Sequence, residues 1–152
     1  MAIKLLYPRV VRREAVREVA LQLVGIPYRH LGRDPHIGFD CLGLVMEFFK
    51  RLDYPMNDGV AWYLEDWWKT QDLISENAPA EFTSIQDLQI LQPLDVVAIC
   101  GNGSAVPNHL MLVVDDTHVL NVAPRVGVHR LRFFVIWRLL VGAYRRRGLK
   151  IL

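Results

Sequence analysis

The stretch GFDCLGLV, residues 38–45, decides the fold, because it places a cysteine between an aspartate and an apolar run. Apolar residues follow at spacings of three and four, the pattern of one buried helix face: Leu44, Val45, Phe48, Phe49 and Leu52. Aspartate is a favoured N-cap residue. The stretch therefore predicts a helix that begins at Asp40 or Cys41 and carries the thiol in its first turn.

The position of Cys41 leaves two interpretations open. The first turn of a helix lies at the positive end of the helix dipole, beside unpaired backbone N–H groups, and both features favour the nucleophilic thiolate. Asp40 opposes this as a neighbouring negative charge, unless its carboxylate turns away to cap the helix. Cys41 is thus either a small hydrophobe in a packed helix or a nucleophile. The second thiol, Cys100, ends an apolar run and is interpreted as structural.

The rest of the chain divides into helices first and strands second. Residues 10–24 have a helical stripe, and residues 25–38 form a loop rich in glycine and proline. A short third helix is expected at 61–71, and its apolar stripe is interpreted as core rather than as the lining of a cleft: Ala61, Leu64, Trp67, Trp68 and Gln71. Strands are expected at 96–100, 109–114 and 118–123, with one or two more in 127–140. This order predicts an α+β fold in a single domain, residues 1–152.

Composition narrows the class of protein. The chain has 152 residues, of which 52% are hydrophobic, and a formal net charge of +2, so it is expected to be globular. No signal peptide and no membrane span are predicted, and the protein is expected to be made in the cytoplasm. No nucleic-acid partner is expected. The basic C-terminal cluster is interpreted as a solvated end rather than as a site for phosphate or an acidic partner: Arg145, Arg146, Arg147 and Lys150.

A hairpin supplies the candidate partners of the thiol. If residues 109–123 turn around Asp115, His109 lies opposite Asn121 on the same face of the sheet. An asparagine carbonyl can accept the imidazole N–H and fix the ring, which is the third role in a Cys-His-Asn arrangement. A zinc site formed by Cys41, Cys100 and His109 is an alternative, but the sequence lacks a clustered ligand set.

Three blocks of the sequence resemble one family. GIPYRHLGRDPHIGFDCLGLV (25–45) resembles the signature of the NlpC-type cell-wall cysteine peptidases, which runs Gly-x-Pro-Tyr, a glycine-rich loop and Phe-Asp-Cys-Ser-Gly-Leu-Val. LQPLDVVAI (91–99) is similar to the family's Leu-x-Pro-Gly-Asp strand opening. HLMLVVDDTHVLNVA (109–123) is similar to its His strand, turn and third polar residue. The resemblance covers roughly residues 12–124.

The resemblance implies a role for each matching residue. Cys41 would be the nucleophile, His109 the base and Asn121 the residue that orients the base. Tyr28, in the Pro-Tyr element, would place its hydroxyl near the developing oxyanion. Asp40 would help to recognise the amino end of the substrate.

The resemblance also implies a fold and a chemistry. The fold would be papain-like, with the nucleophile's helix packed on a C-terminal antiparallel sheet. The chemistry would be hydrolysis of an amide bond in peptidoglycan stem peptides through an acyl-enzyme, without a metal or an organic cofactor. A non-catalytic structural or adaptor domain of a tail or secretion assembly, and an acyltransferase that uses the same thiol, remain as alternatives.

Several residues depart from the family pattern. Leu42 stands where the family has serine in the substrate-facing turn, and Met111 stands where a small residue is usual. Leu31 and Leu94 stand where the family has glycine. Leu42 and the GRDP loop are similar to members found as phage tail components, which implies tail-tip proteins as partners and a virion tail, acting at the bacterial cell wall, as the location.

Overall fold

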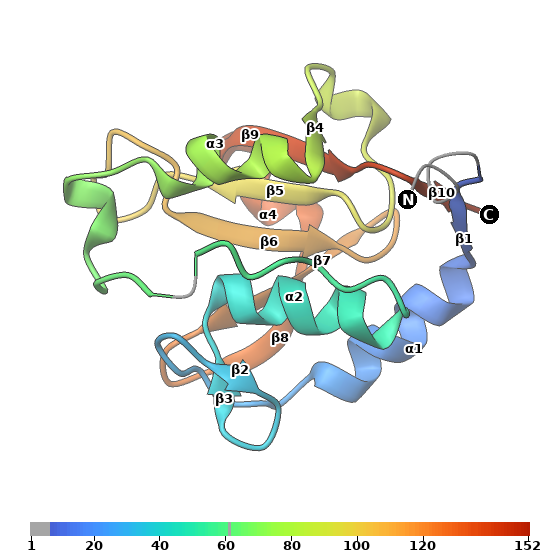
Figure 1. The fold of residues 1–152 in the computed structure, drawn as a ribbon, viewed down its shortest axis with the longest axis horizontal. Helices are drawn as coiled ribbons and strands as arrows, with labels where there is room; N and C mark the ends of the chain where they lie inside the picture. Colours follow the sequence, from blue (N-terminus) through green and yellow to red (C-terminus); the bar gives the residue numbers. More distant parts are fainter. Residues whose placement is uncertain (1–6, 61) are drawn as a thin grey trace.

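The computed structural model describes residues 7–60 and 62–152. The N-terminal half is mostly helical (Figure 1): β1 (Arg9–Val11), α1 (Arg13–Leu23), β2 (Arg33–Asp34), β3 (Gly38–Phe39), α2 (Cys41–Arg51), η2 (Trp67–Lys69), α3 (Leu73–Asn77) and η3 (Ala78–Ala80). The C-terminal half holds the main sheet: β4 (Phe82–Ser84), η4 (Leu88–Ile90), β5 (Val96–Ile99), β6 (His109–Val113), β7 (His118–Ala123), β8 (Gly127–Arg132), α4 (Phe133–Ile136), η5 (Trp137–Leu139), β9 (Leu140–Arg146) and β10 (Leu149–Ile151).

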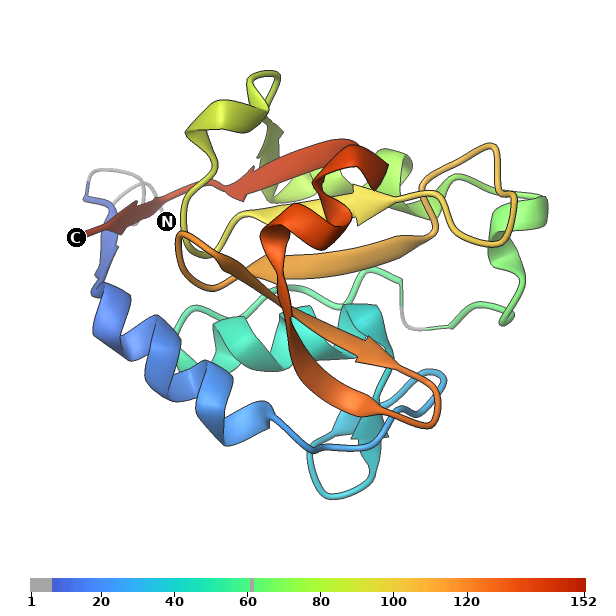
Figure 2. The ribbon, with the colours of Figure 1, turned by 180° about the vertical axis from the view of Figure 1, so that it is seen from behind.

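The main sheet has six strands in the order β4-β9-β5-β6-β7-β8, and every neighbouring pair is antiparallel. Alternate residues of the central strands enter two apolar clusters. Leu110, Leu112 and Leu120 pack with α1 and α2, whereas Met111, Val113 and Val119 pack with Ile136 of α4. Helix α4 lies over the face of the sheet turned toward the viewer in Figure 2. The predicted α+β class, with the helix of Cys41 on an antiparallel sheet, is confirmed.

Helix α2 forms for the reasons that its sequence indicated. The Asp40 side chain caps it by accepting a hydrogen bond from the Gly43 N–H at 2.9 Å. Lys50 and Arg51 lie in its last turn, where positive charge is favourable. Its apolar stripe is buried on the sheet: Leu44, Val45, Phe48 and Phe49.

Glycine at position 43 allows the first turn of α2 to contact the preceding loop. A Cβ on Gly43 would lie 1.9 Å from the carbonyl oxygen of Gly32, and a Cβ on Gly32 would lie 2.1 Å from that of Gly38. No side chain fits at such distances. The loop of residues 29–38 is thereby held directly against the helix start that carries Cys41.

The first and last strands pair with each other, and the three arginines of the basic cluster near the C-terminus are engaged with the rest of the protein. Strands β1 and β10 pair in parallel. Arg145 pairs with the buried Asp95 at 2.7 Å, and Arg146 is itself buried, with 8% of its surface exposed. Arg147 donates hydrogen bonds to the carbonyls of Pro79, Ala80 and Phe82. The expectation of a solvated end was wrong for these three arginines, because their guanidinium groups cross-link segments far apart in the sequence, whereas Lys150 is exposed.

Three other expectations need correction. The first helix begins at Arg13, and residues 9–11 form a strand instead. The expected third helix is one 3₁₀ turn, η2, and Ala61 lies outside the described residues. Within 127–140, the first expected strand is β8, but residues 133–139, where a second strand was considered, are helical. A search of the described helices finds none long and apolar enough to cross a membrane.

Two leucines adopt the left-handed backbone conformation, at the positions where the resembled family has glycine. Leu31 has φ of 60° and Leu94 has φ of 74°. This conformation costs a residue with a Cβ about 1–2 kcal/mol, whereas glycine adopts it without that cost but loses about 0.5–1 kcal/mol of chain entropy on folding. Leu94 offsets the cost by burial in the core, since only 3% of its surface is exposed. Leu31 is only partly buried.

Replacing Leu31 by glycine is therefore expected to raise the free energy of unfolding by up to about 1 kcal/mol. Leu94→Gly is expected to lower it, because the loss of a buried leucine side chain outweighs the relief of strain. Urea titrations of the two variants and the wild type measure both changes. A destabilised Leu31→Gly variant would contradict the assignment of strain to this position.

Candidate active site

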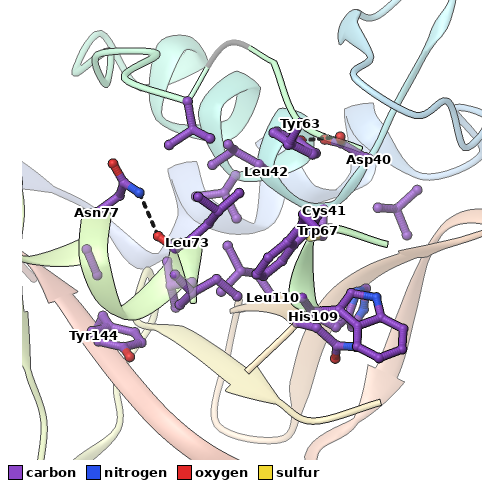
Figure 3. Close-up of a pocket in the computed structure, with 18 of the residues that line it drawn as sticks. Asp40, Cys41, Leu42, Tyr63, Trp67, Leu73, Asn77, His109, Leu110 and Tyr144 are labelled. Carbon is purple, nitrogen blue, oxygen red and sulfur yellow. Dashed lines mark hydrogen bonds between the residues drawn. The ribbon is translucent and has the colours of Figure 1, made fainter. Parts of the chain in front are cut away.

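A cavity of about 660 Å³ opens at the N-terminal end of α2. It is mostly apolar, and its lining includes Tyr28, Cys41, Leu42, Trp67, Trp68 and His109. Figure 3 shows Cys41, Trp67 and His109 at one end of this cavity. The aromatic stripe around Trp67 and Trp68 was interpreted as core, but both indoles are only partly buried and line the cavity instead. The volume suits a ligand of small-peptide size.

Strands β6 and β7 bring His109 and Asn121 together. The His109 Nε2 lies 2.5 Å from the Asn121 Oδ1, and Asn121 is almost fully buried. The register differs from the expected one, because Leu112 pairs with Leu120 rather than with His118, a shift of two residues in the pairing that moves the centre of the turn by one residue. A shift of two residues keeps every side chain on its original face, so Asn121 remains within reach of His109 from a diagonal position.

Cys41 is the first residue of α2, and its side chain lies beside Leu110 of β6, the residue that follows His109. Its sulfur lies near the backbone N–H groups of Leu110 and Leu42, which favour the thiolate. Burial, and then the charge of Asp40, act more strongly in the opposite direction and raise the pKa of the Cys41 thiol to about 11. The lowering effect of the helix start is therefore outweighed, and the pKa of this thiol lies above its ordinary value.

His109 is also held in its neutral form. Burial lowers the pKa of the His109 imidazole; its hydrogen bond with Asn121 opposes this, and the nearby His129 adds to the lowering. With the pKa of the acid raised and that of the base lowered, the resting pair at pH 7 is a thiol and a neutral imidazole. In such a pair, His109 acts as a general base at the moment of attack rather than as one half of a preformed ion pair.

This charge state predicts how the reactivity of Cys41 depends on pH. Because the pKa is raised to about 11, the thiolate fraction grows about tenfold for each pH unit between pH 7 and 10. The rate of iodoacetamide alkylation at Cys41 is expected to follow this slope. The rate is measured in the folded Cys100→Ala variant, so that only one thiol reacts. A rate that is already constant from about pH 5 upward would indicate a thiolate–imidazolium pair and contradict this assignment.

The Asp40 carboxylate organises the loop beside Cys41. Its Oδ1 accepts hydrogen bonds from the Gly43 N–H and from Arg33 Nη1, both at 2.9 Å. Its Oδ2 accepts from the Leu31 N–H at 3.0 Å and from the Tyr63 hydroxyl. Both oxygens are therefore engaged, and a substrate amine could bind Asp40 only by displacing one of these donors. Its role in substrate recognition stays a prediction.

Sequence reasoning missed Arg33 and Tyr63. Arg33 bridges Asp40 and Asp58, and it also donates to the Tyr63 hydroxyl at 3.2 Å. Burial and the Asp40 charge raise the pKa of Tyr63, so its hydroxyl stays protonated and donates to Asp40. No local pattern marks Tyr63, because it lies 23 residues from Asp40 in the chain. This cluster ties the segment after α2 to the loop at the cavity mouth.

The remaining candidate residues occupy different places. Tyr28 lines the cavity, and burial, followed by the Asp40 charge, raises the pKa of its hydroxyl. Leu42 presents an apolar side chain to the cavity at the position where the resembled family has serine. Both cysteines are free thiols. In residues 7–60 and 62–152, no group of three or more His, Cys, Asp or Glu side chains could hold a metal ion, so Cys41, Cys100 and His109 do not form one.

The fold matches that of solved structures of one family. The NlpC/P60 domain of the peptidoglycan hydrolase SagA superposes with a TM-score of 0.61 at 20% identity, over 89% of this chain and 99% of that one. The chain has an NlpC/P60 fold. The expected papain-like architecture is thereby confirmed. No protein-family model matches the sequence, and no curated protein sequence is significantly similar to it.

Two further structures show the range of proteins with this fold. An NLP/P60 family protein of Staphylococcus aureus, described as similar to lipoprotein, matches with a TM-score of 0.59 and 18% identity, over 91% of this chain. This chain spans only 41% of that protein. RipD of Mycobacterium tuberculosis, described as a non-catalytic NlpC/p60 domain protein adapted to peptidoglycan binding, matches with a TM-score of 0.52 and 14% identity, over 89% of this chain and 96% of its own.

Proposed function

We propose that this domain is a cysteine endopeptidase that hydrolyses amide bonds in bacterial peptidoglycan stem peptides. The observation that carries the proposal is the arrangement at one end of the cavity. Cys41 lies against Leu110, and the adjacent His109 is hydrogen-bonded to Asn121. A thiol, an imidazole and an orienting amide are the parts that acyl transfer by a cysteine requires. The likeness to the SagA hydrolase domain supports peptidoglycan as the substrate.

The mechanism follows from the resting charge state. His109 accepts the Cys41 proton as the sulfur attacks the amide carbon, and Asn121 holds the imidazole in position. Backbone N–H groups in the first turn of α2, together with the Tyr28 hydroxyl, stabilise the developing oxyanion. The imidazolium then protonates the leaving amine, and a thioester with Cys41 remains. His109 next takes a proton from water, which attacks the thioester, releases the carboxylic acid and restores the thiol.

Mass spectrometry of purified stem peptides incubated with the reduced, folded domain tests the proposal. Fragments that gain the mass of one water are expected, and their masses identify the bond that is cleaved. A parallel incubation with an amine acceptor separates hydrolysis from acyl transfer, because transfer yields a new amide in place of the acid. The absence of any product from folded, reduced protein would contradict the proposal.

A specific surface favours a second candidate function, that of a structural or adaptor domain in an assembly. Residues 117–152 contain no Asp or Glu. Within them, large apolar side chains are exposed along α4, η5 and the start of β9: Phe134, Val135, Trp137, Leu139 and Val141. Exposed apolar surface of this kind is typical of contacts with a partner protein.

From the sequence resemblance, we also propose that the assembly is a phage tail that acts at the bacterial cell wall, with tail-tip proteins as partners. If the domain serves only the assembly, particles that carry Cys41→Ala are expected to assemble and infect normally. If catalysis is required, they are expected to assemble but to infect poorly. Loss of assembly in Cys41→Ala particles would contradict both expectations.

A further inference from the structure

A third polar side chain, that of His129, lies within hydrogen-bond reach of Asn121 on the side away from His109. His129 of β8 lies directly opposite Asn121 of β7 in the sheet. The Asn121 Nδ2 lies 3.4 Å from His129 Nε2, and the His129 Nδ1 lies 2.8 Å from the carbonyl oxygen of Gly127. A chain of hydrogen bonds thus runs from a backbone carbonyl, through His129 and Asn121, to the ring of His109.

The backbone carbonyl fixes the direction of this chain. A carbonyl oxygen only accepts, so the His129 Nδ1 must carry the proton that it donates to Gly127. In the neutral ring, the His129 Nε2 is then an acceptor, and it accepts from the amide N–H of Asn121. The amide oxygen of Asn121 consequently faces His109 and accepts from its Nε2–H, which leaves the His109 Nδ1 unprotonated.

Gly127 is held in place by its surroundings. It has φ of +76°, pairs with Ala123 across the β7–β8 turn, and lies so close to the preceding loop that a Cβ would meet the carbonyl oxygen of Ile26 at 2.6 Å. The terminal acceptor is therefore a rigid backbone group. Asn121 has an amide whose oxygen and nitrogen would exchange places on a half-turn of the side chain. Among the described residues, the hydrogen-bond partner of Asn121 that distinguishes these two orientations is the acceptor supplied by His129.

We propose that His129 is a positioning residue, which orients the Asn121 amide and through it holds His109 in the tautomer with a free Nδ1. This inference rests on the proposed function only in giving His109 the role of base. Without an acceptor at position 129, the amide can reverse and present its N–H₂ group to His109. The His109 Nε2 would then have to accept, its Nδ1 would carry the proton, and the ring could not take the proton of Cys41 through Nδ1.

Nitrogen-15 NMR of the histidine rings in the full chain tests this arrangement without turnover. At about pH 8.5, well above the ordinary imidazole pKa of about 6.5, protonated and unprotonated ring nitrogens have separate shifts. In the wild type, the proton is expected on Nε2 of His109 and on Nδ1 of His129. His129→Phe keeps a ring but removes the acceptor, and is expected to abolish the single Nε2–H tautomer of His109. His129→Gln, whose amide oxygen can replace Nε2 as the acceptor, is expected to retain it.

Three results would overturn the proposal: a wild-type His109 protonated on Nδ1, an unchanged His109 tautomer in His129→Phe, or the same change in both variants. The wild-type spectrum alone decides the first, even if His129→Phe does not fold. The kinetic counterpart is a lower kcat in His129→Phe with an unchanged KM. Expected tautomers without peptide cleavage would reject the hydrolase and leave the positioning role, whereas cleavage with an unchanged tautomer in His129→Phe would reject the positioning role alone.

Discussion

Cys41→Ala is expected to lower kcat for stem-peptide hydrolysis by roughly 10⁴- to 10⁶-fold, since loss of a nucleophile removes the covalent route. The free energy of unfolding should change little, because Cys41 is only partly buried and lies at the cavity wall. Rates of product formation by the purified wild type and the variant, both reduced, measure the effect.

The second thiol provides the matched control. Cys100 is also free and partly buried, but it does not line the cavity. Cys100→Ala should therefore retain full activity. His109→Ala is expected to cause a loss close to that of Cys41→Ala, because the two side chains act as a unit. Equal activity of Cys41→Ala and the wild type would mean that another group is the nucleophile.

Arg146→Ala is expected to lower the free energy of unfolding by about 3–5 kcal/mol, the usual effect of breaking a buried ion pair from one side. The guanidinium donates hydrogen bonds to the carbonyls of Tyr54 and Pro55 at 2.9 and 3.0 Å and lies 3.1 Å from the Oε2 of Glu81, a buried atom of a partly buried side chain. It also stacks 4.3 Å from the ring centre of Tyr54. Its removal leaves the buried Oε2 of Glu81 without its ion-pair partner and the two carbonyls without this donor.

Denaturant unfolding measures this loss, with Arg138→Ala as the control. Arg138 is exposed, and no ion pair is found for it among the described residues, so its replacement should change the free energy of unfolding by less than about 0.5 kcal/mol. Because Glu81 also lines the cavity, Arg146→Ala should raise KM as well. A loss of less than about 1 kcal/mol would show that Arg146 does not stabilise the part of the cavity wall that contains Glu81.

The parts of the fold that were predictable from the sequence are those with a strong local signal. Helix α2 combines an N-cap at Asp40 with a regular apolar stripe, and both features are observed in the structure. The contact between His109 and Asn121 was also predictable, although the predicted strand pairing was two residues out of register with the observed one. The contact tolerates this error because the side-chain period of a strand is two residues.

The errors fall where a short apolar run fits more than one structure. A second strand was considered within 127–140, but Phe133 and Ile136, three residues apart, pack on the sheet as one helix face. The segment 61–71 has helical spacing, yet its described residues, 62–71, form only the turn η2, and Asp72 starts a new helix by accepting a hydrogen bond from the Ser75 N–H. So short a helix gains little stability without a surface to pack on.

The candidate site was only partly predictable, since several of its contacts join residues distant in the sequence. Tyr63 and Arg33 reach Asp40 only after the chain has folded, and His129 reaches Asn121 across a strand pair. The pKa of Cys41 could not be read from its helix position either. Burial and Asp40 outweigh the helix start, and neither their strength nor their geometry is visible in the local sequence.

The most direct test of the central claim is detection of the acyl-enzyme. The domain is mixed with a stem peptide, quenched in acid after milliseconds to seconds, and analysed by intact-protein and peptide mass spectrometry. A transient adduct is expected, equal in mass to the acyl part of the substrate, located on Cys41 and absent from Cys41→Ala. Product formation in the wild type with the acyl group on another residue, or an equal adduct in Cys41→Ala, would contradict the account.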